Sequence, residues 1–364
     1  MFDAQVVLSP PKSDLGKVLE KYVRVRVTSL EGVDIGHWEY DFHNSLIYFM
    51  TNADEHIYAR YGGRDSRAAE SYLDLNSLRL ALEEGLKQHE LYKEGKLPQR
   101  SRSKPVLPRD IPRIADLVID KRGCVECHHI ADYRAQALEE SGELDKVRTM
   151  FPFPDIRKVG IELDVPKGLV VKGAQGPALA AGMKPGDRIR SIEGKPVITF
   201  GDLQFEYDKV PRTAARITLG VERGGQTISL KLELPPLWWE YDIEWRFWSI
   251  DPVLYFESTP LTADEKKAER LSKESFAARV DEVDPVASML GVHDLKAGDI
   301  IVSVDGAKSD AHIPDARLYL RMKVTPGTSA DLEVLRDDKR IPMTIKTTRQ
   351  YYRKVNPETL DEEG

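Results

Sequence analysis

Hydrophobic and polar positions follow one pattern twice in the C-terminal two thirds of the chain. Residues 178–195 align with residues 287–308, and the match resumes where 215–225 aligns with 330–338. Each copy passes from small residues through a Gly-Asp pair into an apolar run, and then reaches an acidic residue followed by glycine. Both copies therefore predict a short helix, a turn, a buried strand, a second turn, a helix and a two-stranded hairpin.

The N-terminal region has the pattern of an α/β domain. Apolar and polar side chains alternate over residues 22–28, which predicts a strand. Residues 46–50 predict a buried strand, and a turn connects it to an expected hairpin partner at 56–61. Residues 77–87 then predict an amphipathic helix.

Aromatic residues are concentrated between the two copies of the repeat. Four of the five tryptophans lie between Trp238 and Trp248. They suggest either an aromatic platform for a partner or cofactor, or a hydrophobic clasp between the copies, and we favour the clasp because aromatic side chains bury large areas. Thr262, with Glu265 three residues later, predicts the N-cap of a solvated helix.

The whole chain is predicted to be a multidomain α+β protein, because its length suits two to four domains. One basic and proline-rich stretch has the composition of a linker. The predicted divisions are an α/β domain at 1–95, the linker at 96–108, a short helical segment at 109–154, a β-rich domain at 155–235, a tryptophan-rich connector at 236–272, a second β-rich domain at 273–350 and a charged tail at 351–364.

Both cysteines of the chain lie in a single C-x-x-C-H motif, which is typical of covalent haem c attachment. In such a site two thiols bind the porphyrin and the adjacent imidazole binds the iron. Cys124, Cys127 and His128 are therefore predicted to bind haem c, with His128 as the proximal iron ligand. Met150 and His129 are candidates for the sixth ligand, which the sequence does not identify.

Two other kinds of site remain open at this motif. The two thiols suit a disulfide or redox pair, in which the first thiolate is activated at a helix N-terminus. They also suit half of a zinc site, for which His128 or His129 and distant residues would have to supply the remaining ligands.

Charge and hydropathy bear on whether the chain binds nucleic acid and whether it crosses a membrane. The net charge is −7 and the basic residues are dispersed, so nucleic acid is not an expected partner. No apolar run approaches the length of a membrane span, and the first residues lack the pattern of a signal peptide. Because covalent haem is attached outside the cytoplasm in bacteria, the haem hypothesis predicts a periplasmic or extracytoplasmic protein whose export signal is absent from this chain.

Both copies of the repeat resemble PDZ domains of the bacterial, protease-associated kind. In that family a C-terminal or extended peptide adds a strand to the domain, and backbone amides of the preceding loop hold its carboxylate. The resemblance implies a peptide site at Lys167, Gly168, Leu169 and Val170, while the matching stretch at 274–280 has no glycine. The alternative is that these PDZ-like modules are spacers or dimerisation surfaces, and a homo-oligomer is the corresponding prediction for assembly.

The N-terminal hairpin and helix resemble the C-terminal part of a thioredoxin-like domain. With residues 49–54 and 58–65, the cysteine motif and the PDZ-like copies, the chain is similar to the thioredoxin-like/PDZ proteins of environmental bacteria, some of them selenoproteins. This resemblance implies a first strand at 4–8 and an active-site loop after it. Residues 9–12 are Ser-Pro-Pro-Lys and contain no cysteine, so the domain is expected to be a scaffold or docking module.

These observations predict a c-type haem protein that transfers electrons to a redox partner or senses a small ligand, while its PDZ-like modules bind a peptide C-terminus. The rival hypothesis is a haem-free PDZ adaptor in which Cys124 and Cys127 form a redox disulfide or a metal site. Enzymatic activity stays open. We can place no distal His/Arg pair of a haem peroxidase, and no Ser/His/Asp constellation on a protease-like scaffold precedes the repeats.

Overall fold

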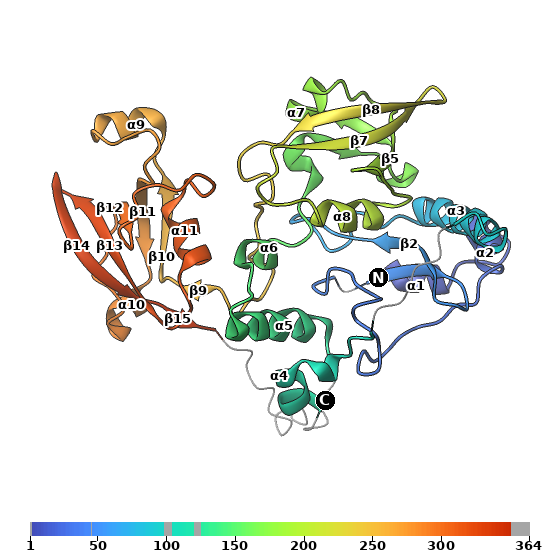
Figure 1. Ribbon diagram of the computed structural model, residues 1–364, viewed down its shortest axis with the longest axis horizontal. Helices are drawn as coiled ribbons and strands as arrows, with labels where there is room; N and C mark the ends of the chain where they lie inside the picture. The colour runs from blue at the N-terminus through green and yellow to red at the C-terminus, as the bar shows by residue number, and fades with distance from the viewer. Residues whose placement is uncertain (1, 45, 98–103, 120–124, 351–364) are drawn as a thin grey trace. The chain divides into compact units, whose positions relative to one another are not determined.

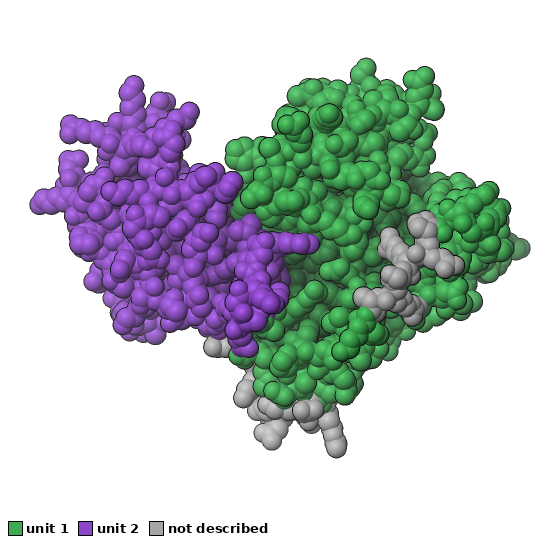
Figure 2. Space-filling view, in the orientation of Figure 1, with its two compact units in different colours: residues 1–137, 151–246 green, residues 138–150, 247–364 purple. Residues whose placement is uncertain are grey.

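The computed structural model describes residues 2–44, 46–97, 104–119 and 125–350. The chain forms two compact units, residues 1–137 with 151–246 and residues 138–150 with 247–364 (Figure 2). Each unit contains helices and antiparallel sheets, which agrees with a multidomain α+β protein (Figure 1). Among the described helices, none combines the length and the apolar character that crossing a bilayer requires.

The N-terminal part of the first unit is built around one hairpin. Strands β1 (Ile47–Thr51) and β2 (Ile57–Gly62) pair antiparallel, as the sequence predicts. Helices α1 (Phe2–Val7), α2 (Asp14–Leu19) and α3 (Leu75–Lys93) pack their apolar residues against this hairpin. Asp74 caps α3 by accepting from the amides of Asn76 and Ser77.

Two strands predicted in this region are absent. Residues 4–8 lie in and just after α1, and residues 22–28 have no strand partner within the described part of the chain. Val23 and Val25 are 91% and 81% exposed, so their alternation with arginine serves no buried face. Alternation specifies a strand only where a neighbouring strand supplies the hydrogen-bond ladder. With only two paired strands among the described residues here, the prediction of a thioredoxin-like sheet is not supported.

A helical segment follows, as predicted. It begins with η1 (Pro108–Asp110), α4 (Pro112–Ile114) and the π-helical turn η2 (Ala115–Ile119), whose apolar side chains meet Ile35, Phe42 and Ile130 in one buried cluster. Helix α5 (Cys127–Ser141) begins at the second cysteine, and α6 (Lys146–Met150) belongs to the second unit.

The first β-domain (residues 156–233) completes the first unit. Its elements are η3 (Ile156–Val159), β3 (Ile161–Leu163), η4 (Val165–Lys167), β4 (Val171–Ala174), α7 (Gly176–Ala180), β5 (Arg188–Ile192), β6 (Lys195–Pro196), α8 (Phe200–Asp208), β7 (Arg216–Arg223) and β8 (Gln226–Glu233). Strands β3 and β4 form one small sheet, and the other sheet has the order β6-β5-β7-β8. In the same unit, α8 lies beside β2 (Figure 1).

The second β-domain (residues 252–349) repeats this order in the second unit. Its elements are β9 (Pro252–Val253), β10 (Phe256–Pro260), α9 (Ala263–Ala268), β11 (Ala278–Val283), α10 (Pro285–Leu290), β12 (Ile300–Val304), α11 (Ala316–Lys323), β13 (Ser329–Arg336), β14 (Lys339–Lys346) and β15 (Thr348–Arg349). Its main sheet has the order β10-β11-β12-β13-β14. The predicted order of short helix, strand, helix and hairpin is confirmed in both β-domains.

One polar device explains why the Gly-Asp pair recurs. Asp187 and Asp299 are each 1% exposed, and each accepts a backbone amide within its own turn. The Nε atoms of Arg223 and Arg336, which end the first hairpin strands, lie 2.6 Å from these carboxylates. A buried carboxylate is stable only when it is paired and hydrogen-bonded, so each pair fastens the turn to the hairpin.

The tryptophan-rich stretch is divided between the units. Trp238 and Trp239 are buried in the first unit, where their rings lie against Tyr207 and Phe151. Inside the predicted connector, Thr262 caps α9 and forms the expected capping box with Glu265. Strand β10 also lies inside this stretch, for which no strand was predicted.

Candidate functional site

The cysteine motif lies at the start of α5. Cys124 is outside the described residues, and the Sγ atom of Cys127 lies 3.1 Å from the hydroxyl of Tyr40. Burial and the neighbouring Cys127 raise the pKa of Tyr40 well above its usual range, so this hydroxyl remains protonated. The Cys127 side chain packs on the buried cluster of the helical segment.

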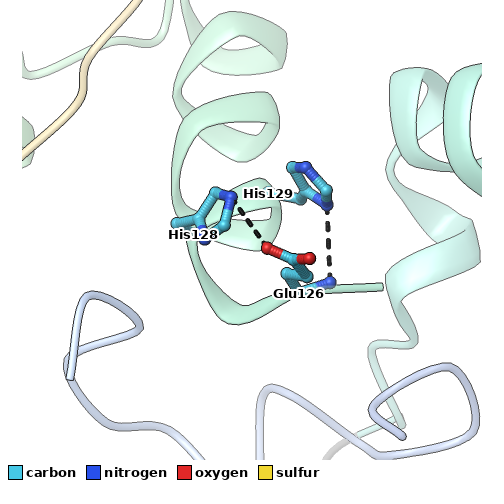
Figure 3. A group of neighbouring side chains, drawn as sticks. All are labelled: Glu126, His128 and His129. Atoms are coloured by element: carbon cyan, nitrogen blue, oxygen red, sulfur yellow. Dashed lines mark hydrogen bonds and ion pairs between the residues drawn. The ribbon is translucent and has the colours of Figure 1, made fainter. Parts of the chain in front are cut away.

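Glu126, His128 and His129 form a compact polar group beside this cysteine (Figure 3). The Nε2 atom of His128 is 3.1 Å from a carboxylate oxygen of Glu126, and one potential ligand atom from each of the three lies within 4.8 Å of the others. Burial, followed by the neighbouring His128, lowers the pKa of the His129 ring. The group has donor atoms that metals use, yet a structural zinc site needs four ligands. Met150, the other candidate ligand, is fully buried in α6.

The predicted peptide-site residues lie at the β3–β4 connection of the first β-domain. The amides of Lys167 and Gly168 donate to Asp164 and Val165 within the η4 turn. The carbonyl of Leu169 accepts from Ile189, and Val170 forms a bridge with Arg188. The amides of Lys167 and Gly168 are therefore bonded within the turn, and the peptide site at 167–170 stays a prediction. A Cβ atom at Gly168 would meet nothing within 4 Å, but its φ of +71° is a conformation that favours glycine.

The second β-domain has a sheet edge of a different kind. Strand β10 is an edge strand of the five-stranded sheet, and among the described strands it pairs only with β11. Tyr255 accepts from the amide of Asp284 at 2.9 Å, and the amide of Leu261 donates to Ala277 at 2.8 Å, so the odd-numbered residues direct their backbone groups toward β11. Phe256 and Ser258 therefore direct their backbone groups to the outer edge.

Helix α11 supplies cations to this outer edge. The Nε atom of Arg317 donates to the carbonyl of Phe256 at 3.2 Å, and its guanidinium pairs with Glu257. One turn later, Arg321 pairs with Asp251, which precedes β9. These contacts place α11 beside the outer edge of β10.

Lys146 of α6 adds an amine at the other end of α11. Its Nζ atom donates to the carbonyl of Val324, the C-cap residue of α11, at 2.7 Å. Burial lowers the pKa of Lys146 to about 8, although Asp251 and Glu139 act in the opposite direction.

Strand β10 was not predicted from the sequence, because it is short and its partner β11 lies 18 residues further along the chain. The sequence of β10 nevertheless has two weak features of a strand. Phe256-Glu257-Ser258-Thr259 alternates apolar and polar residues, and Pro260 ends the strand where a missing N–H does no harm, on the outer edge.

Comparison with known proteins adds a local likeness. No family model matches the chain. The periplasmic serine endoprotease DegP of Escherichia coli (strain K12) is 39% identical over 57 residues, which are 16% of this chain and 12% of DegP. The chain has a local likeness to HtrA/DegP-type serine proteases. It spans only that 12% of the relative, so the likeness does not extend to DegP as a whole.

Solved structures give a likeness to the same class. The HtrA-type protease AlgW with a decapeptide covers 28% of this chain and 30% of its own, with 23% identity and a TM-score of 0.22. A serine endoprotease from Yersinia pestis covers 28% of this chain and 30% of its own, with 19% identity and a TM-score of 0.20.

These findings overturn the haem hypothesis. The curated relative that matches, DegP, is a serine endoprotease, a class that uses no haem, and so the predictions of haem c, iron and electron transfer are wrong. The same finding contradicts the rival prediction of a haem-free adaptor with a redox disulfide or metal site at the cysteines. The C-x-x-C-H spacing is short enough to arise without haem, and in the described part of the motif Cys127 contacts Tyr40 and His128 contacts Glu126.

Proposed function

We propose that this chain is a peptide-binding protein whose second β-domain takes up the C-terminal segment of another polypeptide as an added strand along β10. One observation carries the proposal. The outer edge of β10 presents the N–H and C=O of Ser258 beside α11, and an extended peptide satisfies such groups by strand addition.

The charges beside β10 suit a free carboxylate. Arg317 and Arg321 lie one turn apart on α11, and Lys146 approaches the C-terminal end of the same helix. Glu257 and Asp251 pair with the two arginines, which leaves the local balance positive once Lys146 is counted. The incoming amide replaces the Arg317 guanidinium at the carbonyl of Phe256, while the ion pair of Arg317 with Glu257 is retained.

Support from relatives is limited to their printed descriptions. AlgW has been solved with a decapeptide, and DegP is described as periplasmic, so an extracytoplasmic location is part of this proposal. Endoprotease activity is a property of DegP, of which the matching segment is 12%, and we do not transfer it. A homo-oligomer remains an untested prediction.

Substitution at Ser258 tests the proposal. The probe is a pool of decapeptides with free C-termini and four randomised final positions, from which the tightest binder is selected. Ser258→Pro removes the N–H that faces the outer edge, and we expect it to weaken binding about tenfold or more, since a lost hydrogen bond costs about 1 kcal/mol and the ring adds a clash.

Ser258→Ala is the matched control. The Ser258 hydroxyl is buried and has no hydrogen-bond partner, so its removal should leave affinity within about twofold. C-terminal amidation of the selected decapeptide should weaken binding to the wild-type chain as well. Equal affinity of the Pro and Ala variants, measured by titration calorimetry with both folds intact, would remove β10 as the site.

A further inference from the structure

The N-terminal region of the first unit lies against α8 of the first β-domain. The carbonyl of Arg60 accepts from the hydroxyl of Thr199, and its amide donates to the carboxylate of Asp202 at 2.9 Å. Both partners belong to the N-terminal capping box of α8, and Asp202 is buried. Strand β2 therefore ends in direct contact with the helix that corresponds to α11 in the second β-domain.

The chain continues from β2 along the same helix. Gly63 has a φ of +114°, and a Cβ atom there would lie 2.8 Å from side-chain atoms of both Gln204 and Phe200. The Nε2 atom of Gln204 donates to the carbonyl of Arg64 at 2.9 Å and to that of Phe153 at 3.2 Å. Only a glycine permits so close an approach, so the backbone of 63–64 is seated against α8.

Asp65 brings a carboxylate to the turn that precedes β3. Its Oδ2 atom lies 3.4 Å from the Nε of Arg157 in η3 and accepts from Arg67, and its Oδ1 atom accepts from Ser71. Burial alone would raise the pKa of Asp65, but the hydrogen bonds from Arg67 and Ser71 outweigh it and lower the pKa. An ionised carboxylate thus occupies the turn before the edge strand of this domain.

Tyr72 fills the space between α8 and the β3–η4 stretch. Its ring stacks on Phe200 with 3.3 Å between centroids and 8° between planes, and both side chains are buried. Leu163 and Val165 line, together with Tyr72 and Arg157, a cavity of about 430 Å³. This cavity is what remains open beside β3 once the 63–72 segment is in place.

We propose that the 63–72 segment is a built-in ligand of the first β-domain. Asp65 takes the position of a peptide carboxylate and Tyr72 that of a peptide side chain, so the groove between β3 and α8 accepts no external peptide in the intact chain. This inference rests on the proposed function, because it assigns external peptide to the second β-domain alone. Displacing the segment opens a second site of the same class.

The double variant Asp65→Ala/Tyr72→Ala tests the inference in the full chain. It removes the carboxylate and the ring while leaving α8 and β3 unchanged. Calorimetric titration with the selected decapeptide should give one equivalent for the wild type and two for the double variant. Lys93→Ala, an exposed change on α3 outside these contacts, should stay at one equivalent.

If the double variant does not fold, photo-cross-linking of the peptide to the wild-type chain tests the inference instead. The selected decapeptide, with a photoreactive final residue, should label the wild type within 251–261 or α11 and nowhere in 156–165 or α8. Labelling of 156–165 or α8 in the wild type, or a single equivalent for a folded double variant, overturns the inference. A wild type that binds no peptide, with a double variant that binds one equivalent, removes the function of β10 but supports the built-in ligand. Binding by neither folded protein removes both.

Discussion

Asp41 and Arg246 show how a single buried contact holds the first unit together. The side chains are 2% and 1% exposed, and two hydrogen bonds join them. Burial alone would raise the pKa of Asp41, but the charge and hydrogen bonds of Arg246 hold it far below its usual range. The pair fixes the stretch after the second β-strand of the first β-domain's hairpin to the N-terminal region.

Removing one partner should be costly. Asp41→Ala leaves the Arg246 guanidinium buried without its carboxylate, and we expect a loss of about 3–5 kcal/mol in unfolding free energy, measured by urea denaturation. Asp41→Leu/Arg246→Met, which removes both charges, should lose clearly less. Equal losses for the single and double variants would show that the ion pair is not the cause.

The pH dependence of that loss has a definite sign. A carboxylate whose folded pKa is depressed stabilises the fold above its unfolded pKa, and this contribution disappears as the pH falls. The difference between wild type and Asp41→Ala should therefore shrink below about pH 4.

At the residue scale, the sequence predicted those features that depend on neighbours along the chain. The Gly-Asp turns are present because Asp187 and Asp299 bind amides three residues earlier. The surroundings of Cys127 depend instead on Tyr40, which is 87 residues away, and a four-residue spacing contains no information about it.

At the scale of elements, α11 depends on a cation from α6. The ammonium of Lys146 donates to the C-terminal carbonyl of α11, where a helix dipole favours positive charge. Burial nevertheless lowers the pKa of Lys146 to about 8, below its value in the unfolded chain.

Titration of Lys146 should appear in stability. Between pH 8 and about 10 the unfolded chain binds more protons at this site than the folded chain, so the contribution of Lys146 to stability rises with pH. Relative to Lys146→Met, the wild type should gain about 1–2 kcal/mol between pH 7.5 and 10 in urea unfolding. If the difference in unfolding free energy between the two proteins stays constant across that range, the Lys146 amine is solvated and its pKa is not lowered in the folded chain.

Elements with strong local signals were predicted well. Helix α3, the β1–β2 hairpin and the α9 capping box all follow from periodicity, turn residues or caps. Strand β10 was missed because it is five residues long and its partner β11 begins 18 residues after it ends. Residues 22–28 were assigned to a strand because they alternate, although the described chain offers no strand to pair with them.

At the scale of the whole molecule, the two β-domains share an order of elements but differ in what lies beside their edge strands. Contacts such as that of Arg60 with Asp202, 142 residues apart, join the N-terminal region to α8 of the first β-domain, and no sequence pattern predicts them. The second β-domain has arginines of its own α11 at the corresponding place. Internal repetition therefore predicted the shared order of elements and not the different contacts beside the two edge strands.

Amide hydrogen exchange with the selected decapeptide tests the central claim most directly. Strand addition protects the N–H groups that the edge strand directs outward, and in β10 these include that of Ser258. We predict that saturating peptide slows exchange within 254–261 and leaves 159–165 of the first β-domain unchanged. Unchanged exchange in 254–261 while the chain is saturated with peptide would contradict the account.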